Sequence, residues 1–103
     1  MNNIEYSKAT IAFISTDHRI LNYYLMTTSK GVIVVNNKEY SAVFESKADA
    51  VDFYKTNKTA IHEELKGIAK HIFREKNMIH DVPFKIVVTE TKYESIDDLN
   101  INK

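Results

Sequence analysis

The sequence predicts an α+β domain, in which an antiparallel sheet of four to five strands carries a long amphipathic helix packed on one face. In the first 45 residues, and again near residue 85, β-branched and aromatic residues gather in short runs of strand length. Between these regions the apolar residues recur with the period of a helix. The expected order along the chain is therefore β-β-β-β-α-α-β.

Four strands are expected in the first half of the chain, and for three of them no helical alternative is considered. Residues 8–15 (KATIAFIS) form one, and residues 31–36 (GVIVVN) form another. Asparagine tolerates positive φ, so residues 36–38 are expected to form a turn. Residues 39–45 (EYSAVFE) would then return as the second strand of a hairpin.

Residues 19–28 (RILNYYLMTT) fit two structures. A strand would place Leu21, Tyr23 and Leu25 on one face, whereas a helix would begin after Asp17 and end before Gly31. Two adjacent tyrosines and two threonines favour the strand. The last strand is expected at residues 83–91, since proline is allowed at a first strand position.

Two helices are expected between the strands. Ser46 is a suitable N-cap for a short helix at residues 47–55. Thr59 is expected to cap a longer helix at residues 59–77, and Asn77 is a suitable left-handed stop. The spacing i, i+4, i+7 and i+11 gives the longer helix one apolar stripe, formed by Ile61, Leu65, Ile68 and Ile72.

Length and composition indicate one domain, at residues 1–91, followed by a polar and partly acidic tail at residues 92–103 that we expect to be loosely ordered. The sequence contains no cysteine, which excludes disulfides and thiolate metal sites. Its apolar runs are far shorter than the roughly 20 residues of a membrane span, and no secretory signal is visible. We therefore expect a cytoplasmic protein.

Two residue patterns resemble parts of catalytic or metal sites, and neither is complete. His62 and Glu63 match the start of a zinc-protease helix, but Lys66 stands where the second histidine is required. Residues 15–18 hold serine, aspartate and histidine side by side, although a triad needs them to converge from separate positions. We accordingly predict no catalytic residue, no cofactor and no metal site.

An enzyme or small-ligand domain remains a less favoured hypothesis. Glu64, His71 and Glu75 follow one flank of the long predicted helix and could form an acid–base site in a concave pocket. A row of surface ion pairs explains the same pattern more simply.

Tyrosine offers the clearest indication of a binding surface, because the chain has six tyrosines and no tryptophan. If residues 19–28 form a strand, Tyr23 and Tyr24 face opposite ways. Tyr24, with Ile20 and Met26, would then form a partner-binding patch, unless the short helix or a second copy of the chain covers it. A weaker partner-binding candidate is the acidic C-terminal segment, with Glu94, Asp97 and Asp98.

The leading hypothesis is a small, non-catalytic interaction protein that binds a protein partner stoichiometrically. Abundant Ile, Lys and Asn have A/T-rich codons, which fits a phage or mobile-element inhibitor of a host defence protein such as a nuclease. The alternative is a nucleic-acid-binding protein that uses the basic helix stripe of Lys66, Lys70 and Arg74. A formal net charge of zero disfavours that alternative.

Overall fold

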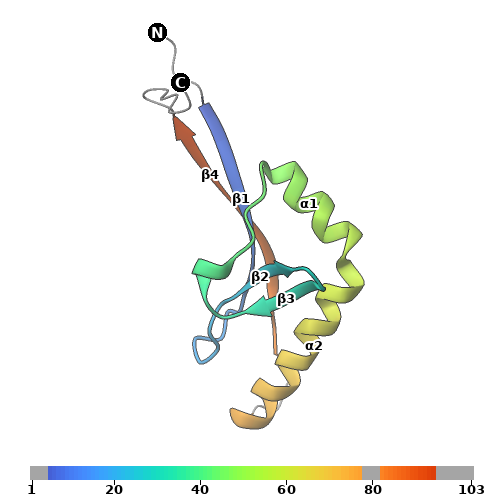
Figure 1. Cartoon of the computed structure of the whole chain (residues 1–103). Helices are drawn as coiled ribbons and strands as arrows, with labels where there is room; N and C mark the ends of the chain where they lie inside the picture. Colours follow the sequence, from blue (N-terminus) through green and yellow to red (C-terminus); the bar gives the residue numbers. More distant parts are fainter. Residues whose placement is uncertain (1–4, 78–81, 95–103) are drawn as a thin grey trace.

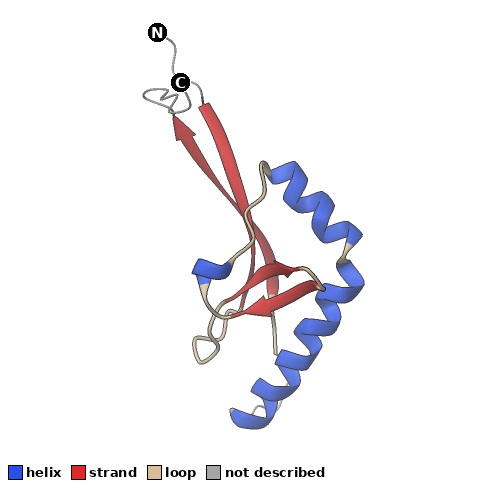
Figure 2. Cartoon of the chain, viewed as in Figure 1, coloured by secondary structure: helices blue, strands red, loops and turns tan. Residues whose placement is uncertain are grey.

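The computed structural model describes residues 5–77 and 82–94, which form an antiparallel sheet and two α-helices (Figures 1 and 2). In chain order the elements are β1 (Glu5–Ile14), β2 (Tyr23–Thr28), β3 (Gly31–Val35), the 3₁₀ helix η1 (Lys38–Tyr40), α1 (Lys47–Thr56), α2 (Lys58–Glu75) and β4 (Lys85–Glu94). The strand order is β3-β2-β1-β4. The predicted α+β fold with an antiparallel sheet is therefore confirmed.

The pairing of β1 determines which residues share a face of the sheet. Strand β4 pairs with all ten residues of β1, whereas β2 pairs with β1 only at two positions. Residues directly opposite each other in antiparallel strands project to the same face. Phe13 lies opposite Tyr23 and Ile86 on one face, and Ala12 lies opposite Tyr24 on the other.

The core lies between one face of the sheet and both helices. Alternate residues of β1 are fully buried there with one residue each from β2, α1 and α2, namely Ala9, Ile11, Phe13, Leu25, Ala50 and Ile61. Helix α1 contacts β1 and β4, while α2 contacts β3, so the two helices lie on the same side of the sheet (Figure 1). Each large apolar side chain buried in this layer stabilises the fold by about 1.5–3 kcal/mol.

The predicted hairpin of residues 31–36 and 39–45 is wrong. The Asn37 side chain accepts a hydrogen bond from the backbone N–H of Glu39 at 3.0 Å, and the chain turns into η1 instead of a second strand. Strand β3 pairs with β2, with Thr28 opposite Gly31. The predicted turn at Asn37 does form, but it begins the 3₁₀ helix η1 and not a hairpin.

The segment after η1 fills a gap in the sheet. Phe44 forms an isolated antiparallel bridge with Ala9, through N–H···O bonds of 2.9 and 2.8 Å. The backbone N–H of Ala42 donates to the carbonyl of Leu25 at 2.7 Å. Buried backbone groups require partners, and this segment supplies them where β1 and β2 no longer pair.

Most helix boundaries follow the predicted signals. Ser46 caps α1, because its Oγ accepts the N–H of Asp49 at 3.1 Å. The expected cap of α2 was wrong, since Asn57 is its N-cap and Thr59 lies within the helix. Asn77 has a φ of 51°, as expected for a left-handed stop.

Three strands differ from expectation in their bounds. Strand β1 begins at Glu5, three residues before the expected start at residue 8. Residues 23–28 form a strand, as favoured over a helix, but residues 19–22 precede it. The last strand, β4, begins at Lys85 and runs three residues into the expected tail, to Glu94. The rest of that tail, including Asp97 and Asp98, lies outside the described residues.

Replacing Ile61 with alanine should destabilise the protein by about 2–5 kcal/mol, because its fully buried side chain joins α2 to the sheet. Ile68→Ala is the matched control: it removes the same atoms from the same helix at a half-buried position, so its cost should be smaller. Urea unfolding of both variants measures the difference. Equal losses would show that Ile61 does not anchor α2.

Candidate functional site

The sheet face that points away from α1 and α2 is mostly apolar, and we call it the outer sheet face. The register places side chains from all four strands on it. One row crosses the sheet from β3 to β4, formed by Val35, Tyr24, Ala12 and Val87. Further apolar side chains extend this face on either side of the row, namely Ile14, Met26 and Ile33.

Tyr24 is at the centre of the outer sheet face. It lies on β2 between Val35 and Ala12, and it is half-buried, as are Met26 and Ile33. A hollow of about 500 Å³ adjoins Tyr24, lined also by Leu21, Asn22, Asn36, Asn37 and Lys38. The predicted patch around Tyr24 and Met26 thus coincides with a sheet face that neither α-helix covers (Figure 1).

Ile20 takes a different place from the one expected. Its side chain is only 6% exposed, so it has almost no surface to offer a partner. Leu21 is 66% exposed and borders the hollow. Strand alternation had grouped Leu21 with Tyr23 and Leu25, but residue 21 precedes β2, so the alternation does not apply to it.

The turn before β2 is held by a polar network around Asp17. The Arg19 guanidinium donates to both carboxylate oxygens, with Nε at 3.0 Å from Oδ1 and a terminal nitrogen at 2.6 Å from Oδ2. The backbone N–H of Arg19 also donates to Oδ1 at 2.9 Å, and Ser15 Oγ accepts the N–H of Asp17 at 3.0 Å. This network explains the Ser-Thr-Asp-His sequence as turn structure and fixes the loop that carries Leu21.

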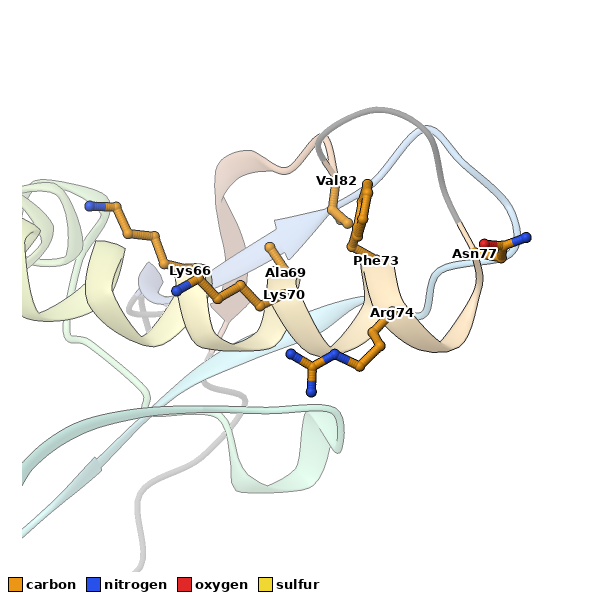
Figure 3. A pocket seen from close by; sticks show the side chains of 7 residues that line it. All are labelled: Lys66, Ala69, Lys70, Phe73, Arg74, Asn77 and Val82. Atoms are coloured by element: carbon orange, nitrogen blue, oxygen red, sulfur yellow. The ribbon is translucent and has the colours of Figure 1, made fainter.

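A second hollow, which we call the basic groove, lies along α2. Its volume is about 900 Å³, and seven residues line it (Figure 3), namely Lys66, Ala69, Lys70, Phe73, Arg74, Asn77 and Val82. All three residues of the predicted basic stripe are among them. The stripe prediction missed Phe73, which is 44% exposed.

The cations of the basic groove are largely unpaired. Lys66 Nζ lies 3.4 Å from Glu63 Oε1, and both side chains are mostly exposed. Within residues 5–77 and 82–94, Lys70 and Arg74 form no ion pair. The groove therefore presents positive charge beside an aromatic ring.

The histidines of α2 form no shared site in the described part of the chain. His62 Nε2 is 2.7 Å from the hydroxyl of Tyr54 on α1. His71 Nε2 lies 3.4 Å from Glu75 Oε1, with both side chains exposed, and neither residue lines either hollow. The described residues include no group of three or more His, Cys, Asp or Glu side chains that could hold a metal ion. His71 and Glu75 therefore form an exposed side-chain contact one helical turn apart, and Glu64 is not part of it.

The sequence matches no protein-family model, and neither curated proteins nor solved structures include a significant relative. In the described ranges, no helix has the length and apolar character needed to cross a membrane.

The Asp17 network should make the stability of the protein depend on pH in the acid range. The hydrogen bonds from Arg19 lower the pKa of Asp17 well below its ordinary value. Because the carboxyl pKa is lower in the folded than in the unfolded protein, Asp17 stabilises the fold at pH values above its pKa in the unfolded chain, about 3.9. This stabilisation is lost as the pH falls below that value toward the lowered pKa of the folded state.

Thermal unfolding of the wild type and of Asp17→Asn, measured between pH 7 and pH 2, tests this expectation. The variant should melt at a lower temperature at pH 7, and the difference should narrow below about pH 4. A constant difference across this range would contradict the assigned role of the carboxylate.

Proposed function

We propose that this protein acts without catalysis, by stoichiometric binding of a protein partner through the outer sheet face. The observation that supports the proposal most directly is the apolar row across all four strands, with Tyr24 at its centre and neither α1 nor α2 on that side. Within this row Val35, Tyr24 and Val87 are half-buried and Ala12 is only 4% exposed, so the accessible apolar surface comes from the side chains around Ala12. Contiguous accessible apolar surface on a small domain is typical of interaction sites.

The chemistry of the outer sheet face resembles that of protein interfaces. Tyrosine is common among the residues that dominate binding energy, because it buries a large area with few rotatable bonds and retains a polar hydroxyl. Lys85 projects to the same face, and Lys38 borders the hollow beside Tyr24. Lys8 also projects to this face, but its ammonium group is paired with Glu45 at 3.1 Å. An apolar centre with a cationic rim suits a partner that has carboxylates around an apolar patch.

Short length and A/T-biased composition support one form of this proposal, in which a phage or mobile element encodes the protein as an inhibitor of a host defence protein such as a nuclease. An inhibitor of this kind needs only a surface that occupies its target. The outer sheet face would provide that surface.

Two adjacent residues of β2 provide a matched test. Met26 is half-buried on the outer sheet face, while Thr27 is exposed and projects to the opposite face. Met26→Lys should weaken partner binding at least tenfold, because it places a charge in the apolar centre of the interface. Thr27→Lys adds the same charge and should bind like the wild type.

The partner would first be captured with a photo-crosslinking residue at Tyr24, then purified and titrated by calorimetry. The expected result is a one-to-one complex that Met26→Lys disrupts and Thr27→Lys does not. Sedimentation of the protein alone gives its oligomeric state. A stable dimer that Met26→Lys dissociates would mean that a second copy covers the face, and the proposal of a different partner would be wrong.

A further inference from the structure

We propose that the basic groove on α2 is a second binding site, whose ligand is single-stranded nucleic acid. This inference is independent of the outer sheet face, because it rests on other residues and on another element. Lys66, Lys70 and Arg74 recur every four residues along α2. A helix rises 1.5 Å per residue, so their Cα atoms follow the helix axis at intervals of about 6 Å.

Charge complementarity indicates an anionic ligand. Among the described residues that line the groove, three are cations and none carries a carboxylate. Lys70 and Arg74 have no ion-pair partner in the described chain, so their charges are not already neutralised. Figure 3 shows these side chains extending from one flank of α2, where a phosphate backbone could follow them.

The aromatic ring distinguishes nucleic acid from other polyanions. Phe73 lines the groove beside Ala69 and Val82 and is 44% exposed, while the Arg74 side chain extends from the opposite edge of α2 (Figure 3). Sites for single strands combine a positively charged groove with aromatic side chains on which bases stack. A duplex keeps its base faces stacked and offers none to Phe73, and an acidic peptide gains nothing comparable from the ring.

The number of cations sets the expected salt dependence. If three phosphates are neutralised, the logarithm of the association constant should fall against the logarithm of salt concentration with a slope of about −2. Affinity should then decrease roughly 20-fold between 50 and 200 mM salt. Dye-labelled 12-nucleotide DNA and RNA strands of mixed sequence, followed by fluorescence anisotropy, would measure this slope.

Charge variants test the location of the site. Lys70→Glu combined with Arg74→Glu should abolish binding at 50 mM salt. The matched control is Lys30→Glu combined with Lys47→Glu, which makes the same change in net charge at exposed positions outside the groove. The control should bind within about threefold of the wild type. A neutral pair, Lys70→Gln with Arg74→Gln, repeats the test if the glutamate pair melts at a lower temperature.

Phe73→Leu tests the stacking contact separately from charge. Leucine preserves apolar contact but removes the ring, so affinity should fall about fivefold or more at every salt concentration while the salt slope stays unchanged. Absence of binding at 50 mM salt, or an equal effect of the control pair, would overturn the proposal. It would also be overturned if a glutamate-rich peptide bound as tightly as the strands and Phe73→Leu had no effect, because the groove would then recognise acidic protein segments.

Discussion

The hydrogen bonding of β1 on both of its edges is the constraint on which the rest of the fold depends. Strand β4 covers one edge along its full length, while β2 and Phe44 share the other. This arrangement fixes which residues of β1 face the helices, namely Ala9, Ile11 and Phe13. A slip of one residue would turn these side chains outward and bring Thr10 and Ala12 into the core, so the register is strongly specified.

Both α-helices pack on one side of the sheet, so neither of them covers the outer sheet face. Asn57 alone separates α1 from α2, so the second helix has no connection long enough to cross to the other side. The hydrogen bond between the Tyr54 hydroxyl and His62 Nε2 joins the helices across that break. The short connection keeps both helices on one side, and the strands place apolar residues around Tyr24 on the other side. Both features are needed to leave an apolar sheet face that neither helix covers.

Periodicity predicted the elements of this fold but not all of their partners. The alternation in residues 8–15 and the apolar stripe from Ile61 to Ile72 follow from local geometry, and both helices and the first strand appear where they were expected. Residues 39–45 alternate equally well, yet only Phe44 forms a bridge, and it does so with β1. Strand pairing depends on which edge is available in space, and no local pattern contains that information.

The candidate surfaces show the same division between local and tertiary information. The sequence placed Tyr24 and Met26 on one face, because alternation within β2 is local. The sequence pattern placed Ile20 on the exposed face and Leu21 on the opposite face, whereas Ile20 is buried and Leu21 is exposed. Their exposure depends on a turn held by Asp17 and Arg19, which strand alternation does not describe. Phe73 lay outside the predicted stripe, and it is 44% exposed near the C-terminal end of α2, which extends beyond β3 (Figure 1).

The formal net charge of zero conceals an uneven distribution of charge along α2. Lys66, Lys70 and Arg74 line the groove, whereas Glu64, His71 and Glu75 do not. Because a Debye length is about 8 Å at physiological salt, a ligand in the groove responds to the cations beside it more than to distant carboxylates.

Three cations still supply only a modest, salt-sensitive affinity for the proposed ligand. A contact of this strength gains most when another surface of the same molecule is also bound, since linked sites raise the effective concentration. The outer sheet face is composed largely of uncharged side chains, so the partner binding proposed there would be less sensitive to salt and would suit that second attachment.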